Sequence, residues 1–301
     1  MITSEYHEPV LLSDSVDWLI TDQNGVYMDV TYGGGGHSRE VLNRLGQEAL
    51  LIGVDQDLDA QENIIDDERL LFVQSNFAYI THFLEYYDIG GVDGILADLG
   101  VSSHHFDEAE RGFSYRYDAL LDMRMNQSAK HTAADILNGY AMQDLQAVFS
   151  AYGELRNSKT LASVIVESRR TAKVEMVADL ERIIDRIYRG DRQRYSAQVY
   201  QALRIEVNDE LEVLKDMLLS AMYALKSGGR LVVISYHSLE DKLVKQLFRD
   251  NNFEKKKMVD EFGRSQNVLE PLTKKPIIPS EQEIEKNSRA ASAKMRVAQK
   301  K

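Results

Sequence analysis

The sequence predicts an α/β fold in which a parallel β-sheet carries an inserted helical domain. Three observations support this prediction. Short runs rich in Val, Ile and Leu recur along residues 25–101, and helix-like stretches lie between them. A further run of this kind follows at 229–237, after a long gap. The 301-residue chain is 44% hydrophobic and 28% charged, which is enough apolar material to bury a sizeable core.

Four predicted strands come first. They are "GVYMDVTY" at 25–32, "ALLIGVDQD" at 49–57, "RLLFVQSNF" at 69–77 and "VDGILADLGV" at 92–101. Strands that alternate with helices at this spacing are typical of βαβ units, whose parallel strands are buried on both faces. The fifth predicted strand is "GRLVVISYH" at 229–237.

The gap between the fourth and fifth strands has helical periodicity instead. Apolar residues spaced i, i+3, i+4 and i+7 form one helix face in each of two segments. They are Leu145, Val148, Phe149 and Tyr152, and then Val177, Leu180, Ile184 and Ile187. We therefore predict a discontinuous sheet domain at residues 1–105 and 198–301 and a helical domain at 106–197. The end of the chain is polar, and we expect it to be partly disordered on its own.

The composition excludes several classes of protein. The chain has no cysteine, which rules out disulfides and thiolate metal sites and fits a cytoplasmic location. No run reaches the roughly eighteen apolar residues of a membrane span, and the start lacks the basic region of a signal peptide. The net charge is -12, yet residues 242–301 contain 15 Lys and Arg against 8 Asp and Glu, a local +7. This basic end is either an RNA-facing surface or a solvated tail.

The stretch "YMDVTYGGGGHSREVL", residues 27–42, places four glycines between the first predicted strand and a helix. Backbone N–H groups in such a turn can approach a ligand, and the helix N-terminus adds partial positive charge. Gly33 and Gly35 give Gly-x-Gly, although Ser38 replaces the third glycine of the dinucleotide fingerprint. A flexible turn is the alternative. Asp55, at the end of the second strand, is placed to bind the two hydroxyls of a ribose, or else to cap a helix.

These features fit an adenosine-containing cofactor, either a dinucleotide or S-adenosylmethionine. Asp29, four residues before Gly33, matches the acid-x-x-x-Gly-x-Gly pattern of methyltransferases, in which the acid orders the glycine loop. The segment "LKSGGRLVVISYHS" is similar to the "LKPGGRLVVV" segment of Rossmann-like methyltransferases. S-adenosylmethionine is therefore the favoured cofactor.

Nine segments of the sequence occur in the order found in one known family. They are "YHEPVLL", "DVTYGGGGHS", "GILADLGVSS", "DEAERGFSY", "LDMRM", "VYQALRIEVNDEL", "ISYHSLEDK", "LEPLTKKPIIPSEQEIEKN" and "SAKMRV". They resemble the ribosomal small-subunit RNA cytosine-N4 methyltransferase family, RsmH (also MraW), from about Tyr6 to Val297. The resemblance implies a Rossmann-like class I S-adenosylmethionine-dependent methyltransferase fold with an inserted all-helical domain, and a homodimer in some members.

The resemblance also implies a reaction and a set of cofactor contacts. The reaction is methylation of the exocyclic N4 of one cytidine in 16S rRNA, near the decoding centre of the small (30S) ribosomal subunit. By position, the cofactor contacts are Gly35, Gly36, His37, Asp55, Phe77 and Asp98. The next family position normally reads Gln in "SSPQLD", whereas "SSHHFD" places His105 there, and histidine can still donate one hydrogen bond. In the tail, "NSRAASAKMRV" stands where "NPRSRSAKLRV" is usual, so one arginine is missing.

The chemistry of the implied reaction suggests further roles. Cytosine N4 is a weak nucleophile, so nitrogen, methyl and sulfur must be held in line. Asp98 lies where related amino-methyltransferases place the acid of a D/N/S-P-P-Y motif, and we expect it to bind the cofactor first and to act in catalysis second, unless it is a strand-end cap. Tyr236 could stack on an unstacked base, and Ser235 or His237 could hydrogen-bond its edge. His237 is a candidate proton acceptor or the N-cap of the next helix.

Three other functions stay open on the sequence alone. A DNA amino-methyltransferase is disfavoured by "DLGV" in place of the D/N/S-P-P-Y motif, and a non-methylating assembly factor is disfavoured by the glycine loop and Asp55. An NAD-dependent dehydrogenase is the third. No metal is expected at His104 and His105, because no further ligand is fixed by spacing. The segments "RGFSY" and "DMRM" are implied by the family to close over the cofactor.

Overall fold

The computed structural model describes residues 9–100, 111–126, 129–254 and 267–301. The chain divides into two compact units, Met1–Gly100 with Glu212–Lys301, and Val101–Leu211. We call them the sheet unit and the helical unit. The sequence placed the second boundary at 197/198, which falls inside one continuous helix of the helical unit, α9.

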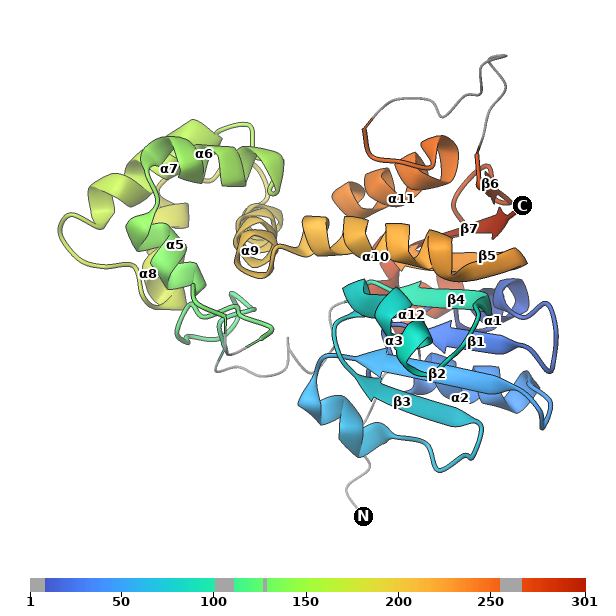
Figure 1. The fold of residues 1–301 in the computed structure, drawn as a ribbon. Coiled ribbons are helices and arrows are strands. Elements are labelled where there is room, and N and C mark those ends of the chain that lie inside the picture. The colour runs from blue at the N-terminus through green and yellow to red at the C-terminus, as the bar shows by residue number, and fades with distance from the viewer. Residues whose placement is uncertain (1–8, 101–110, 127–128, 255–266) are drawn as a thin grey trace. The chain divides into compact units, whose positions relative to one another are not determined.

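The sheet unit is built on seven strands in the order β3-β2-β1-β4-β5-β7-β6 (Figure 1). The first five strands are β1 (Val26–Asp29), β2 (Leu50–Asp55), β3 (Leu70–Gln74), β4 (Val92–Asp98) and β5 (Leu225–Ser235). These strands pair in parallel. Each coincides with a predicted strand, and the predicted Rossmann-like α/β fold is confirmed. β5 begins before the predicted 229–237 and includes Gly228 and Gly229, near which its register against β4 shifts.

Two strands at the end of the chain correct the expectation of a partly disordered tail. β7 (Lys294–Lys300) pairs antiparallel with β5 on one side and with β6 (Leu269–Pro271) on the other. Its polar appearance is misleading because Arg296, which is 8% exposed, pairs with Asp241 through Nε at 2.6 Å. A buried charge that has a partner in good geometry is compatible with a central strand.

The two faces of the sheet follow from period-2 alternation in the strands. Helices α3 (Ile80–Tyr86), α10 (Glu210–Ala224) and α11 (Ser238–Asp250) cover one face, and α1 (Leu12–Leu19), α2 (Gly36–Arg44) and α12 (Glu281–Lys286) cover the other (Figure 1). In β4, for example, Ile95 and Ala97 pack on the first face and Leu96 on the second. Each fully buried aliphatic side chain of this kind contributes about 1.5–3 kcal/mol.

The helical unit contains α5 (Ala133–Gly139), α6 (Met142–Ala151), α7 (Ser158–Ser168), α8 (Val177–Asp185) and α9 (Arg192–Asn208). The predicted helix faces are confirmed, since Leu145, Val148 and Phe149 of α6 and Val177, Leu180 and Ile184 of α8 are buried in one core. Within the described part of this unit, the extended pairing is limited to one isolated bridge, Leu120 with Met176.

Candidate active site

The parallel strands end at one edge of the sheet, and polar residues stand at these ends. Asp29, Asp55, Asp98 and Ser235 are the last residues of β1, β2, β4 and β5. The carboxyl ends of parallel strands are where folds of this type bind ligands. The predicted acids are therefore brought to one edge by the sheet itself.

The glycine loop connects β1 to α2, and its backbone has two left-handed positions. Gly33 has φ +50° and Gly35 has φ +70°, a region in which residues with a Cβ are uncommon. Gly35 is the N-cap of α2, and no side chain caps this end of the helix. An uncapped helix N-terminus can offer its first N–H groups to a ligand.

The missing side chains serve the protein's own packing at two of these glycines. A Cβ at Gly36 would lie 2.3 Å from Pro9 Cγ, and one at Gly35 would lie 2.8 Å from the Tyr32 hydroxyl. At Gly33 a Cβ would meet nothing closer than 3.9 Å. Gly35 and Gly36 are thus needed so that the chain can pack on itself, whereas the space beside Gly33 is open to a ligand.

Asp55 hydrogen-bonds to the loop from the end of β2. Its Oδ2 accepts from the Gly33 N–H at 2.7 Å, and its Oδ1 accepts from the Asp57 N–H at 2.9 Å. Burial raises the pKa of the Asp55 carboxyl, and these two N–H donors oppose that shift. Each carboxylate oxygen keeps a second acceptor site. Asp55 can therefore still accept hydrogen bonds from two ribose hydroxyls, and this contact stays a prediction.

Asp29 anchors the start of α2 to the end of β1. The carboxylate is 2% exposed; its Oδ2 accepts from Ser38 Oγ at 2.7 Å and its Oδ1 from the Thr31 N–H at 3.1 Å. Ser38 stands where the dinucleotide fingerprint has its third glycine, so the departure from that pattern supplies a hydroxyl to the acid. Thr31 Oγ1 also accepts from the Asp98 N–H at 2.7 Å. Sequence reasoning gave no role to Thr31, and its only signal was its place next to the loop.

His37 lies in the first turn of α2 and is 7% exposed. Its Nε2 lies 3.1 Å from the Val10 carbonyl oxygen. Because a carbonyl oxygen can only accept, Nε2 carries the hydrogen. Its Nδ1 lies 3.9 Å from Oδ2 of Asp98. His37 therefore hydrogen-bonds to the N-terminal segment and lies close to the tip of β4.

Asp98 is the residue on which several predicted site residues converge. Its Oδ1 accepts from the Gly100 N–H at 3.0 Å, and the Tyr236 phenol hydrogen-bonds to its carboxylate. The Tyr236 ring lies 3.0 Å from where a Cβ on Gly100 would stand. The structure thus brings together Asp98, His37 and Tyr236 from three elements. Stacking of Tyr236 on a base stays a prediction.

The other two predicted residues after β5 have structural partners. Ser235 is 2% exposed, and its Oγ donates to the Lys294 carbonyl at 3.2 Å between β5 and β7. His237 is the N-cap of α11: Nδ1 accepts from the Glu240 N–H at 3.4 Å, and Glu240 Oε2 accepts from the His237 N–H at 3.2 Å. His237 Nε2 lies 3.0 Å from Glu240 Oε1 without hydrogen-bond geometry. These contacts favour the capping alternative, and a proton-acceptor role stays a prediction.

The electrostatics of this edge favour a positively charged ligand. Burial is the largest cause that raises the pKa of the Asp29 and Asp98 carboxyls, and the neighbouring His37 opposes it in both. The pKa of Asp55 is raised for the same reason. Buried carboxylates are unfavourable unless donors or cations accompany them. A cation bound at this edge would therefore stabilise the ionised acids.

The remaining predicted contacts are Phe77 and His105. Phe77 begins the 3₁₀ turn η2 (Phe77–Tyr79) after β3, and it packs partly into the core on the α10 face. His105 and the adjacent His104 lie outside the described residues. Among the residues that the structure does describe, three metal-ligating side chains are nowhere grouped together. The described helices also include none with the length and apolar character of a membrane span.

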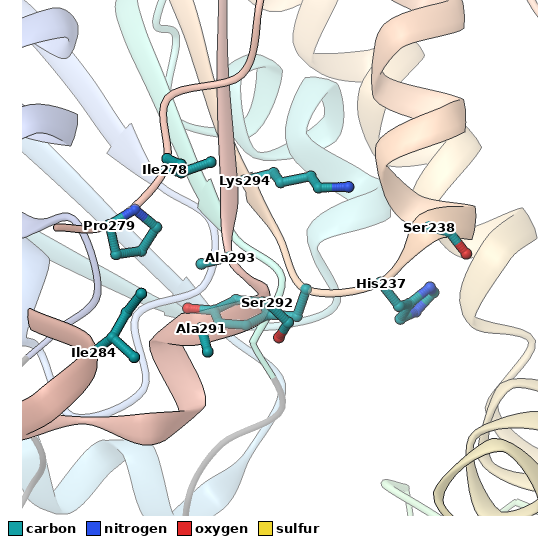
Figure 2. A pocket seen from close by; sticks show the side chains of 10 residues that line it. His237, Ser238, Ile278, Pro279, Ile284, Ala291, Ser292, Ala293 and Lys294 are labelled. Atoms are coloured by element: carbon teal, nitrogen blue, oxygen red, sulfur yellow. The ribbon is translucent and has the colours of Figure 1, made fainter. Parts of the chain in front are cut away.

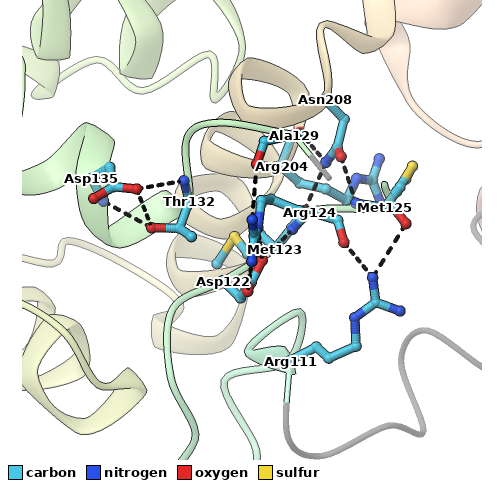
Figure 3. Close-up of polar contacts among 10 residues, drawn as sticks. All are labelled: Arg111, Asp122, Met123, Arg124, Met125, Ala129, Thr132, Asp135, Arg204 and Asn208. Atoms are coloured by element: carbon cyan, nitrogen blue, oxygen red, sulfur yellow. Dashed lines mark hydrogen bonds and ion pairs between the residues drawn. The ribbon is translucent and has the colours of Figure 1, made fainter. Parts of the chain in front are cut away.

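The "LDMRM" segment at 121–125 belongs to the helical unit and is held by that unit's own contacts (Figure 3). Arg124 pairs with Asp122 through Nε at 2.7 Å and Nη2 at 2.8 Å. Asn208 of α9 donates to one backbone carbonyl of the segment at 2.8 Å and accepts from one N–H at 2.7 Å. Arg111, the first residue of "RGFSY", donates to two further carbonyls. Arg124 thus stabilises the conformation of its own segment. Closure of this segment over the cofactor stays a prediction.

The site also uses an N-terminal segment to which sequence reasoning assigned no role. Pro9 packs against Gly36, as its distance to a Cβ there shows. The Leu11 N–H donates to Glu283 Oε1 in α12 at 2.6 Å. Segments from opposite ends of the chain therefore meet beside the glycine loop. The available signal was that "YHEPVLL" and "PSEQEIEKN" both belong to the nine segments that resemble one family.

Comparison with known proteins identifies the family. A profile of the MraW methylase family matches residues 4–301. Ribosomal RNA small subunit methyltransferase H of Bacteroides fragilis strain YCH46 is 54% identical over 297 residues, which cover 98% of this chain and 98% of that protein. The protein of the same name from Bacteroides thetaiotaomicron is 53% identical over 297 residues, again 98% of each chain.

Among solved structures, TrmN from Thermus thermophilus matches 97% of this chain at 9% identity with a TM-score of 0.45, and this chain spans 48% of it. The sequence relatives and the whole-length profile are far closer. The chain belongs to the MraW methylase family.

Proposed function

We propose that this protein transfers a methyl group from S-adenosylmethionine to the exocyclic N4 of one cytidine in 16S rRNA, near the decoding centre of the small (30S) ribosomal subunit. Membership of a methylase family over nearly the whole chain supports the methyl transfer. Relatives more than half identical bear the name of a small-subunit rRNA methyltransferase, which supports the substrate. The observation that carries the chemistry is Asp98 at the tip of β4, with His37 and Tyr236 against its carboxylate.

The residues at the sheet edge fit S-adenosylmethionine, which has a sulfonium and an ammonium group. The carboxylates of Asp29 and Asp98, which are partly or fully withdrawn from water, match these positive charges. The open space beside Gly33 adjoins Asp55, where folds of this type hold a ribose. We propose that Gly33 and Asp55 bind the adenosine part and that Asp98 faces the methionine part. When bound, the cofactor supplies an electrophilic methyl group.

In the proposed reaction, N4 would form a bond to the methyl group as the methyl–sulfur bond breaks. The cofactor would leave as its thioether, and N4 would lose one proton to water. The backbone carbonyl after Asp98 accepts a hydrogen bond from the amine, and the Asp98 carboxylate offsets the positive charge that develops on nitrogen. Gly100 and Tyr236 donate to that carboxylate and fix its orientation before the substrate arrives. The target cytidine must be unpaired and unstacked, because N4 is occupied in a base pair.

Mass spectrometry of ribosomal RNA from cells that lack this protein tests the proposal. We expect the loss of one N4-methylcytidine from 16S rRNA, with restoration by the wild-type gene and no restoration by Asp98→Ala at equal protein level. An unchanged N4-methylcytidine content would refute the assignment of a 16S rRNA cytidine as the substrate. Purified protein that binds subunits tightly but never transfers labelled methyl groups would show a non-catalytic assembly factor. Transfer to duplex DNA and not to subunits would show a DNA enzyme.

Two further expectations accompany the proposal. The homodimer implied by the family is tested by sedimentation of the purified chain, in which a single species of monomer mass would refute it. The expected cytoplasmic location is tested by fractionation, in which the protein should follow the ribosomal fraction.

A further inference from the structure

A pocket lies beside the candidate active site, on the side of β5 away from the glycine loop. Its volume is about 280 Å³, and Tyr236, Ser238, Ile278, Ile284, Ser292 and Lys294 are among its lining residues. Figure 2 shows Ile278, Pro279 and Ile284 along one side and Ser238 on the opposite side, with Lys294 extending from β7 toward the start of α11. We call this the β5–β7 pocket.

The pocket opens at the same edge of the sheet as the acids. Ser235, at the carboxyl end of β5, pairs with Lys294, at the amino end of the antiparallel β7. Tyr236 therefore belongs to both places: it lines the pocket, and its phenol hydrogen-bonds to Asp98. Neither Asp98 nor the glycine loop lines the pocket. The pocket is next to the candidate methyl-transfer position without being part of it.

The lining of the pocket combines apolar side chains with polar groups. Ile278 is 66% exposed and forms part of one wall, and Ser292 is an exposed residue of the lining. The Lys294 ammonium makes no hydrogen bond or ion pair with any residue in the described parts of the chain. The N-terminus of α11 adds partial positive charge beside Ser238. Apolar walls, hydroxyls and a cation suit a planar polar ring that carries a phosphate.

We propose that the β5–β7 pocket receives the unstacked base of a nucleotide that neighbours the methylated cytidine, with Lys294 on its phosphate. This inference rests on the proposed function, because it takes the RNA strand as the ligand. The pocket is just below the roughly 300 Å³ at which sites for drug-sized ligands begin, so it fits one base rather than a peptide segment. The basic end of the chain, with a local +7 over residues 242–301, supplies most of the lining and attracts the strand.

Two substitutions in the pocket test the proposal, each with a matched control. Ile278→Glu places a carboxylate at the mouth of the pocket, and Tyr86→Glu places the same charge at a residue 82% exposed on α3. Lys294→Ala removes the cation, and Lys245→Ala removes an exposed lysine of α11 outside the pocket. Both positions in the first pair are largely exposed, so these variants should fold.

The first readout uses 30S subunits from cells that lack the protein. We expect Ile278→Glu and Lys294→Ala to raise KM for subunits at least about 5-fold with little change in kcat, while the affinity for S-adenosylmethionine stays within twofold. The control variants should behave as wild type. An equal loss of cofactor affinity in Ile278→Glu would show that the pocket belongs to the cofactor site and would overturn the inference.

The second readout uses a fluorescein-labelled single-stranded RNA nonamer with a central cytidine, in which each neighbour of that cytidine is made abasic in turn. Wild type should bind one of these abasic strands about 5- to 150-fold more weakly, the range for loss of one stacked base. Ile278→Glu should show no further loss at that position. Lys294→Ala should also reduce the slope of log affinity against log salt by about 0.7, the value for one phosphate contact on a single strand.

The outcomes separate this inference from the proposed function. If N4 methylation occurs but the pocket variants and the abasic strands behave as wild type, the inference is wrong and the proposed function stands. If the pocket variants weaken subunit binding while no abasic strand does so, the pocket binds a protein side chain and the inference is again wrong. If the strands bind as expected but no cytidine is methylated, the pocket assignment holds and the proposed function fails.

Discussion

Replacing Gly36 with alanine should destabilise the protein even though Gly36 begins a helix, where alanine is intrinsically favoured. The preference for alanine over glycine in a helix is about 0.5–1 kcal/mol. Against it, the new Cβ would lie 2.3 Å from Pro9 Cγ and 3.2 Å from Pro9 Cδ. Carbon atoms in contact are normally about 3.5–4.0 Å apart, so the proline must move by more than about 1 Å. Overpacking of this kind costs about 1–3 kcal/mol. Because the proline must move this far, we place the cost in the upper half of that range, which leaves a net loss of about 1–2 kcal/mol.

The displacement should also reach the cofactor site. Val10, next to Pro9, holds His37 through the 3.1 Å contact between its carbonyl oxygen and Nε2. If the whole net loss is felt by the ligand, the affinity for S-adenosylmethionine falls by up to about 30-fold, which corresponds to 2 kcal/mol. Urea denaturation measures the loss of stability, and isothermal titration calorimetry measures the loss of affinity.

A control and a rescue make this prediction refutable. Gly139 is the last residue of α5, and a Cβ there would meet nothing within 4 Å. Gly139→Ala should therefore be neutral or slightly stabilising. Pro9→Gly should remove most of the cost of Gly36→Ala, because the clash needs both partners. If Gly36→Ala costs the same in the Pro9→Gly background as in wild type, the packing explanation of Gly36 is wrong.

Four further predictions concern Tyr236, the three acids at the sheet edge, His237 and Arg296. Tyr236→Phe should remove a hydrogen bond to a charged group, which is worth about 1.5–3 kcal/mol. Because that bond lowers the pKa of Asp98, its loss should raise this pKa further and move the acid limb of the methylation pH profile to higher pH. An acid limb that does not move would exclude this role for Tyr236. Burial raises the pKa values of Asp29, Asp55 and Asp98 above 3.8, so the contribution of these carboxyls to folding stability is present at low pH and lost as pH rises. Binding of a cation, in contrast, needs the ionised carboxylates. Titration calorimetry should therefore show that S-adenosylmethionine binds more weakly as pH falls, with a smaller effect for the thioether product, which has lost the sulfonium charge. His237→Asn should keep the α11 cap and the activity, while His237→Ala should lose about 0.5–2 kcal/mol in urea; a stable but inactive Asn variant would instead support proton transfer. Arg296→Met should cost about 3–5 kcal/mol by leaving Asp241 buried without its partner, and Asp241→Leu in the same chain should recover much of that loss.

The five parallel strands were predictable because their signal is local. A strand buried on both faces must be apolar along its whole length, as "GILAD" is, and the polar residue that ends it stands out. The same reasoning placed Asp55 at the end of the second strand. The structure brings Asp29 and Asp98 to the same edge, because the carboxyl ends of the parallel strands coincide. β7 was missed because its burial depends on a partner elsewhere. "KMRVAQK" reads as polar until Asp241 is seen to neutralise Arg296.

The contacts within the site were less predictable because most of them join distant parts of the chain. Tyr236 was expected to face the RNA base, and nothing in "ISYHS" indicates that its hydroxyl reaches an acid more than a hundred residues earlier. The capping role of His237 was visible as an alternative, since His-x-x-Glu at a helix start has the spacing of a capping box. The four glycines were read as one ligand cradle, whereas at Gly36 the neighbour that requires a glycine is Pro9.

The energetic logic of the site explains why these contacts are so numerous. Each of the three acids is partly or fully withdrawn from water, which by itself disfavours the folded protein at neutral pH. Every one of them accepts hydrogen bonds from backbone or hydroxyl donors, which offsets part of that loss and fixes the carboxylates in place. These donors carry no net positive charge, so the negative charge of the carboxylates is not neutralised by them. A cationic methyl donor would neutralise that charge. Because the site is already held rigid, binding would cost little conformational entropy.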